Sequence, residues 1–154
     1  MGWSYLRYSI EIGLKNLMMD KQEKIIVCID DERIILFALR IQLERLLTKD
    51  FTIECFTDGE EAIEFIHESV GEGRSLPLVI TDEMMPKLRG HEIIEKLSVD
   101  CPQIRCLLLT GYASSDVLVE LPKKFPLVEI MAKPWKQADL VETVYNLINT
   151  SKES

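Results

Sequence analysis

The chain has 154 residues, 47% of them hydrophobic and 29% charged, and its formal net charge is −8. This length and composition are typical of one globular domain and exclude a disordered chain. The acidic balance argues against a nucleic-acid surface, which needs a basic patch. It suits a partner with basic features or a site that holds a metal cation.

The location is expected to be cytoplasmic. No apolar run approaches the ~20 residues of a membrane span, so we expect no membrane association. Arg7, Glu11 and Lys15 interrupt any apolar core of a signal peptide. The cysteines lack CxxC spacing, which favours reduced thiols over disulfides or zinc ligands. They are Cys28, Cys55, Cys101 and Cys106.

The first 20 residues stand apart from the rest of the chain. An apolar stripe at helical spacing predicts a peripheral helix, packed on the domain or on a second copy in a homodimer. The stripe comprises Trp3, Leu6, Ile10, Leu14 and Leu17. The alternative is a frayed segment, or a natural start nearer Met18 or Met19. We therefore divide the chain into an extension (1–20), a domain (21–150) and a short tail (151–154).

The domain begins with an apolar run, Lys24–Asp31, that ends in two acids. Leucines at helical spacing follow from Glu32 and predict the first helix of the domain. Thr52–Phe56 alternates like an edge strand. Asp58 is then expected to cap a second helix, with Glu61 as its capping-box partner.

Strands and helices continue to alternate along the second half. The expected strands are Leu78–Thr81, Ile104–Thr110 and Leu127–Lys133. Short helices are expected after Gly90 and from a Ser114 or Ser115 cap to a point before Pro122, because proline disrupts a helix interior. A last helix carries Leu140, Val141, Val144, Leu147 and Ile148.

Five alternations of strand and helix predict the α/β class, with a parallel sheet covered by helices on both faces. Three of the strands are almost continuously apolar, as strands buried on both faces are. The predicted fold is a doubly wound five-stranded parallel sheet of flavodoxin-like order 2-1-3-4-5.

Polar residues gather where these strands end. Asp30 and Asp31 end the first strand, Asp82 the third, Thr110 the fourth and Lys133 the fifth. Ligands of open α/β sheets bind at this edge, and the first and third strands are neighbours in the predicted order. Three carboxylates together raise one another's pKa, and Mg²⁺ would relieve this. A metal, a lysine and a hydroxyl are the electrostatic equipment of phosphoryl transfer, and one carboxylate would serve as nucleophile.

Each of these residues also has an ordinary structural interpretation. Asp30 and Asp31 would cap the following helix, and Asp82 would open a turn. Thr110 would be a strand-end residue and Lys133 a surface lysine. All five interpretations holding at once is the less favoured alternative.

From about Lys24 to Thr150, the sequence resembles the receiver domain of two-component response regulators. The resemblance rests on VCIDDE (Val27–Glu32), TDEMMP (Thr81–Pro86), LLLTGYA (Leu107–Ala113) and AKPW (Ala132–Trp135). Any one of these motifs is weak evidence, but together and in this order they are highly specific.

The resemblance implies a role for each matching residue. Asp82 would accept a phosphoryl group from a phosphohistidine. Asp31, Asp82 and the backbone carbonyl of Met84 would bind Mg²⁺ directly, and Asp30 would act mainly through water. Lys133 would pair with the phosphoryl oxygens, and the Lys133–Pro134 bond would be cis. Thr110 would move to hydrogen-bond the phosphate.

The implied partners are a sensor histidine kinase or a histidine phosphotransfer protein, and a downstream protein. The downstream protein would bind the face formed by the helix before Pro122, the strand Leu127–Lys133 and the last helix. Because one helix and a short tail follow Lys133, we expect a stand-alone receiver rather than an enzyme.

Some residues depart from the family pattern or lie outside it. Ile130 stands where an aromatic switch residue is usual; Tyr112 is a possible substitute, although a solvent-facing side chain is favoured. Glu83 is expected to face solvent. His67 and His91 are expected to be exposed helix residues, despite the kinase-like His-Glu pair at His67.

The alternative function is a pseudo-receiver that binds partners without phosphorylation, favoured by Ile130 alone. A phosphatase is less favoured, because Met84 occupies the position of its second acid. A flavin-binding protein is less favoured too, since DDERI has the wrong charge for a phosphate-cradling loop.

Overall fold

The computed structural model describes residues 2–20, 22–111 and 115–149, with the backbone alone for residues 15–20. Its centre is a five-stranded sheet in the order β2-β1-β3-β4-β5, with every neighbouring pair parallel. The predicted order is therefore confirmed. The strands are β1 (Lys24–Ile29), β2 (Phe51–Phe56), β3 (Ser75–Asp82), β4 (Arg105–Thr110) and β5 (Val128–Ala132).

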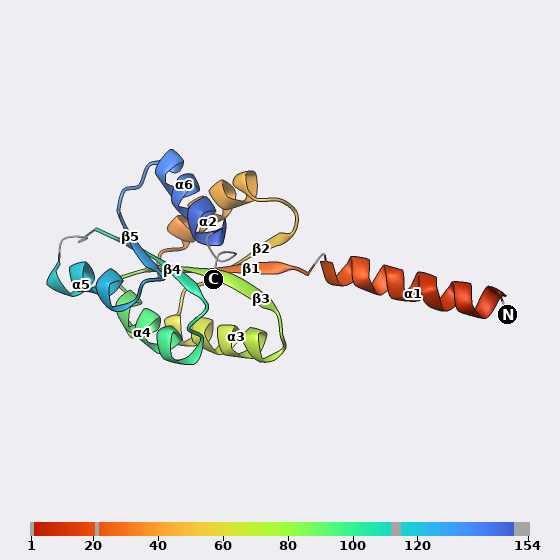
Figure 1. Ribbon diagram of the computed structural model, residues 1–154. Helices are drawn as coiled ribbons and strands as arrows, with labels where there is room; N and C mark the ends of the chain where they lie inside the picture. Colours follow the sequence, from red (N-terminus) through yellow and green to blue (C-terminus); the bar gives the residue numbers. More distant parts are fainter. Residues whose placement is uncertain (1, 21, 112–114, 150–154) are drawn as a thin grey trace.

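Helices cover both faces of the sheet (Figure 1). α2 (Arg33–Leu46) and α6 (Gln137–Asn149) lie on one face. The opposite face carries α3 (Gly59–Gly71), α4 (Gly90–Asp100) and α5 (Asp116–Lys124). This arrangement gives two hydrophobic cores, one on each side.

The strands supply both cores because successive side chains point to opposite faces. In β1, Ile25, Val27 and Ile29 enter the core under α3 and α4. Ile26 and Cys28 enter the core under α2 and α6. The continuous apolar run of β1 thus follows from its burial on both faces.

The site edge is set by the pairing of β1 with β3. Ile29 at the end of β1 lies beside Thr81, so the residues that follow, Asp30 and Asp82, come close together at the carboxyl ends of these strands. The chain reverses its direction of winding between these two strands, which is the switch point where such sheets bind ligands.

The structure tests one predicted helix start and one predicted helix end. Asp58 caps α3 as expected, because its Oδ1 accepts the backbone N–H of Glu60 at 2.9 Å and of Glu61 at 3.1 Å. The prediction that the helix after β4 ends before Pro122 is wrong, since α5 continues to Lys124. Pro122 removes one helical hydrogen bond, but the burial of Leu118 and Leu121 holds the last turns in place.

The predicted N-terminal helix is present as α1 (Gly2–Asp20), which extends away from the sheet (Figure 1). Every side chain from residue 2 to residue 14 is exposed, and Trp3 reaches 87%. The expected packing on the domain is therefore not seen for residues 2–14, and the role of this extension remains a prediction. Among the described residues, no helix is long and apolar enough to cross a membrane.

Candidate phosphoryl-acceptor site

Three carboxylates meet at the carboxyl ends of β1 and β3. Asp30, Asp31 and Asp82 each offer an oxygen, and these oxygens lie within 4.8 Å of one another. Asp30 and Asp82 are 1% and 6% exposed, whereas Asp31 is open to solvent. The sequence predicted this convergence, and the parallel pairing of the two strands produces it.

Lys133 approaches the cluster from the end of β5. Its Nζ lies 3.0 Å from Asp30 Oδ2 and 2.9 Å from Asp82 Oδ1. Its backbone N–H donates to the carbonyl oxygen of Thr110 at 2.8 Å, which ties the lysine to the end of β4. The Lys133–Pro134 peptide bond is cis, as expected.

The pKa shifts follow from this crowding. Burial is the main cause that raises the pKa of Asp30, and the charge of Asp82 adds to it. Hydrogen bonds from Glu32 and Lys133 oppose the rise without cancelling it. Burial alone would lower the pKa of Lys133, but its hydrogen bonds to Asp82 and Asp30 outweigh burial and raise it. One ammonium group shared by two carboxylates therefore leaves this cluster negative.

The donor set fits a small, hard cation. Carboxylate and carbonyl oxygens are the ligands that Mg²⁺ prefers, and Mg²⁺ keeps several waters of its own. Asp30 already uses both oxygens, because Oδ1 accepts the backbone N–H of Glu32 at 2.8 Å and Oδ2 contacts Lys133. Such an engaged carboxylate favours a contact through water over direct ligation.

Thr110 and Met84 lie on the same rim. Thr110 is fully buried at the end of β4, beside Ala132 of β5. Met84 follows in the β3–α4 loop with its side chain 48% exposed, and its sulfur accepts a hydrogen bond from Arg89 at 3.1 Å. The structure thus groups Asp30, Asp31, Asp82 and Lys133 by contact, and places Thr110 beside them through the backbone bond to Lys133.

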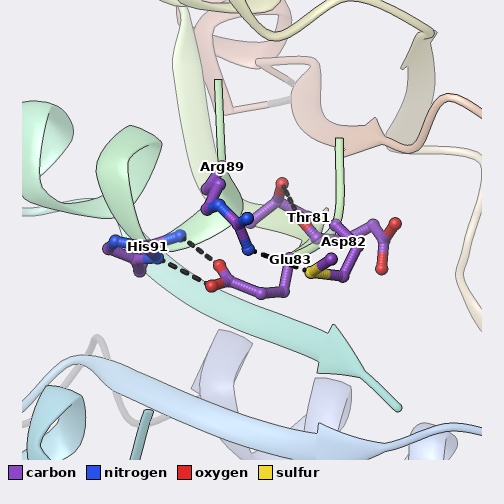
Figure 2. A network of polar contacts seen from close by, with 6 residues as sticks. Thr81, Asp82, Glu83, Arg89 and His91 are labelled. Carbon is purple, nitrogen blue, oxygen red and sulfur yellow. Dashed lines mark hydrogen bonds and ion pairs between the residues drawn. The ribbon is translucent and has the colours of Figure 1, made fainter. Parts of the chain in front are cut away.

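Glu83 is a residue that sequence analysis misplaced. It was expected to face solvent but is only 6% exposed. Its Oε1 accepts the backbone N–H of His91 at 2.8 Å, and its Oε2 lies 2.7 Å from His91 Nδ1. Figure 2 shows the Glu83 side chain directed toward His91, away from the Asp82 carboxylate. The expectation of an exposed His91 is also wrong, since its side chain is 18% exposed.

This pair anchors the start of α4 to the end of β3. The carbonyl of Glu83 also accepts the N–H of Gly90 at 3.1 Å, so side chain and backbone close the same loop. A signal for the pair was available in the sequence: an acid directly after a buried strand, and a histidine at the next helix start. Because side chains alternate along a strand, Glu83 points to the face opposite that of Asp82. On that face, the first turn of α4 offers free backbone N–H donors.

The other residues that depart from the family pattern or lie outside it have ordinary structural surroundings. His67 is exposed, as expected, and its Nε2 lies 3.1 Å from Asp100 Oδ2. Ile130 is half-buried and packs against the core under α3, α4 and α5. Tyr112, weighed as a substitute for an aromatic switch residue, lies outside the described residues, as does Ser114.

The chain belongs to the response regulator receiver domain family, whose model matches residues 26–145. Receiver domains are modules of two-component signalling rather than enzymes in the ordinary sense, and they interact with histidine kinases or phosphotransfer proteins. The fold and the acidic edge described above are those of this family.

Two curated relatives differ in how much of their length is matched. The chain is 31% identical over 144 residues to the probable methanogenesis regulatory protein FilR2 of Methanothrix harundinacea, covering 90% of this chain and 89% of that protein. It is 26% identical over 127 residues to the hydrogenase transcriptional regulatory protein HoxA of Cupriavidus necator. That match covers 82% of this chain but only 24% of HoxA.

Solved structures agree with the fold. A response regulator receiver domain protein from Clostridium thermocellum is 28% identical, with a TM-score of 0.71. The match covers 84% of this chain and 97% of that one.

Proposed function

We propose that this protein is a phospho-accepting receiver in which Asp82 takes a phosphoryl group from a phosphohistidine partner in the presence of Mg²⁺. The observation that carries the proposal is the position of Lys133, whose Nζ contacts both Asp30 and Asp82 within the carboxylate cluster. An Asp82 oxygen attacks phosphorus, the phosphorus–nitrogen bond breaks, and the histidine nitrogen leaves.

Each neighbouring group has a task in this step. Asp31, Asp82 and the carbonyl of Met84 would hold Mg²⁺, and Asp30 would act through water, in keeping with its engaged oxygens. The metal would neutralise charge on the phosphoryl oxygens during transfer. Lys133 would turn from the carboxylates to these oxygens, and Thr110 would hydrogen-bond the product.

The output surface is proposed to be the face formed by α5, β5 and α6. A phosphoryl group adds about −1.5 to −2 charges, which act on Thr110 and Lys133 at the ends of β4 and β5. Since Ile130 replaces the usual aromatic residue on β5, movement of this surface would not use an aromatic flip. A sensor kinase or a phosphotransfer protein would be the donor.

A stand-alone receiver, located in the cytoplasm, remains our proposal for the whole protein. The match to FilR2 over 89% of its length supports a protein of this size, whereas HoxA is much longer than the matched region. Binding without phosphorylation is the alternative, and Ile130 is the feature in its favour.

The test is the intact mass of the protein after incubation with acetyl phosphate, with and without Mg²⁺. We expect an adduct of one phosphoryl group that requires Mg²⁺ and is absent from Asp82→Asn. Asp58→Asn is the matched control, because Asp58 caps α3 and is not one of the three clustered carboxylates, so its replacement should leave the adduct unchanged. No adduct in the folded wild-type protein would favour the pseudo-receiver alternative.

A further inference from the structure

Two cysteines face each other across the outer pair of strands. Cys28 of β1 is in register with Cys55 of β2, and the strands are parallel, so both side chains point to the same face. Cys28 is fully buried in the core under α2 and α6, and Cys55 is half-buried against it. Neighbouring strands lie about 4.8 Å apart, which is within the Cα separation of roughly 4.4–6.8 Å that disulfides span.

The groups around Cys55 favour a reactive sulfur. Its pKa is lowered mainly by hydrogen bonding with the Cys28 side chain, and further by the hydrogen bonding and charge of Arg40 from α2. Burial and the charge of Glu54 oppose these effects, but the hydrogen bonds prevail and lower the pKa of Cys55 to about 6. A thiolate next to an arginine and a second cysteine is the environment of oxidisable cysteines.

The other two cysteines lack this environment. Cys106 lies beside Val79 and Val128 in the sheet, and burial raises the pKa of its thiol to about 12. Burial also raises the pKa of Cys101. They are therefore internal controls for reactivity within the same protein.

We propose that Cys55 is a site of oxidation by hydroperoxides, with Cys28 as the resolving thiol. The Cys55 thiolate attacks a peroxide oxygen, the O–O bond breaks, and the leaving alkoxide or hydroxide takes a proton, which leaves Cys55 as a sulfenic acid. The thiol of Cys28 then attacks the sulfur of Cys55, the S–O bond breaks, and the leaving hydroxide takes the Cys28 proton and departs as water. The two thiols lose two electrons to the peroxide and form a disulfide.

The position of β2 allows this bond to form. Directly opposed Cβ atoms in a sheet lie somewhat farther apart than the roughly 3.5–4.5 Å of a disulfide, so the strands must approach slightly. β2 is an edge strand that pairs with β1 alone, so fewer strand hydrogen bonds oppose a small shift of β2 than of a central strand. A strained disulfide is more reducible, so a dithiol should reverse the modification. This proposal does not depend on phosphorylation of Asp82.

The experiment treats the reduced full-length wild-type protein with hydrogen peroxide, followed by intact mass and peptide mapping. We expect loss of two hydrogen atoms per chain, a Cys28–Cys55 linkage, and recovery by dithiothreitol. The initial rate should fall as the pH drops below about 6, as the Cys55 pKa requires. A linkage through Cys101 or Cys106, or bonds between chains alone, would overturn the proposal.

Variants separate the two steps. In Cys28→Ala, dimedone should capture a sulfenic acid at Cys55, and Cys55→Ser should prevent both products. Cys101→Ser, the control, should oxidise like the wild type. Circular dichroism checks folding, and the wild-type peptide map decides the question without any variant. Labelling of Cys101 or Cys106 at the rate of Cys55 would contradict the assignment.

Discussion

Two buried acids stand side by side at the end of β3, and their surroundings differ. Asp82 shares Lys133 with Asp30 and lies beside Asp31, so its region carries more negative than positive charge. Glu83 receives a backbone N–H from α4 and contacts the His91 ring. Both are nearly inaccessible to solvent, at 6% exposure each.

The difference separates the acid that we propose to be reactive from a structural one. A buried carboxylate whose neighbours are carboxylates needs a cation or a proton, and this need supports the proposed site for Mg²⁺ and a phosphoryl group. A carboxylate at a helix N-terminus with two partners is satisfied and fixes the chain in place. Burial of an acid alone therefore does not identify a functional residue.

Gly90 links the two regions, and its replacement should have the largest effect. A Cβ at this position would lie 2.2 Å from the Asp82 carbonyl oxygen and 2.6 Å from Leu108 Cδ1. Neither the backbone nor the packed core yields easily, so Gly90→Ala should destabilise the protein by about 3 kcal/mol. Thermal unfolding should then occur roughly 6–12 °C lower.

Gly71→Ala is the matched control, because nothing lies within 4 Å of its Cβ position at the end of α3. It should leave the melting temperature within about 3 °C of the wild type. Equal melting temperatures for Gly90→Ala and the wild type would show that the loop between the two acids adapts readily.

Most of the proposed site was predictable because all of its residues except Met84 lie at or directly after the end of a strand. Apolar runs ending in Asp30, Asp82 and Lys133 fix both the element and the edge of the sheet. Glu83 was not predicted, since its burial depends on where α4 begins and packs, which is set by tertiary contacts. The course of α5 through Pro122 was missed for the same reason: buried leucines outweighed a local propensity.

The extension shows the same limit. Its periodicity predicted a helix correctly, but periodicity does not tell what covers an apolar stripe. Trp3 and Leu6 remain exposed in α1, at 87% and 54%. The sequence pattern thus predicted the helix α1 but not the surface against which its apolar stripe packs.

Removing Lys133 should sharpen the contrast between the two acids. Lys133→Met leaves Asp30 and Asp82 without their shared ammonium group. Loss of a buried partner costs about 3–5 kcal/mol, and since the lysine side chain is 20% exposed we expect about 1–3 kcal/mol. Chemical denaturation without metal should show this loss, and Mg²⁺ should stabilise the variant more than the wild type.

Lys87→Met provides the comparison, since Lys87 is exposed and 3.5 Å from Asp58. Its effect should stay below about 0.5 kcal/mol, with no dependence on Mg²⁺. If Lys133→Met were as stable as the wild type without metal, the excess negative charge of the cluster would not cost the stability that we ascribe to it.

The Glu83–His91 pair should contribute to stability rather than to chemistry. Glu83→Ala and His91→Ala should each destabilise the protein by about 1–2 kcal/mol, and the double variant by less than their sum. Glu83→Gln should recover part of the loss, because an amide oxygen still accepts the His91 N–H. All three single variants should reach the wild-type extent of modification by acetyl phosphate. If folded Glu83→Gln formed no adduct, Glu83 would be needed for the chemistry, and the distinction between Asp82 and Glu83 would be wrong.

The smallest expected effect concerns pH. Burial raises the pKa of Asp30 above its ordinary value of 3.8. At a pH between 3.8 and the raised pKa, the folded protein therefore binds more protons than the unfolded chain. The contribution of Asp30 to stability is therefore largest at low pH and declines as the pH rises through the raised pKa. In metal-free buffer, the wild type should lose stability relative to Asp30→Asn as the pH increases from about 4.

The contribution of Asp58 to stability should depend on pH in the opposite direction, so Asp58 is a control for the direction of the effect at Asp30. Hydrogen bonds from the backbone N–H groups of Glu61 and Glu60 lower its pKa below 3.8. Its stabilising contribution is present above 3.8 and is lost as the pH falls through the lowered value, so Asp58→Asn should matter least in acid. Denaturation curves of both variants across this range would test the assignment, and parallel trends would contradict it. Opposite pH dependences of stability for the two variants would show that folding disfavours the charged form of Asp30 and favours the charged form of Asp58.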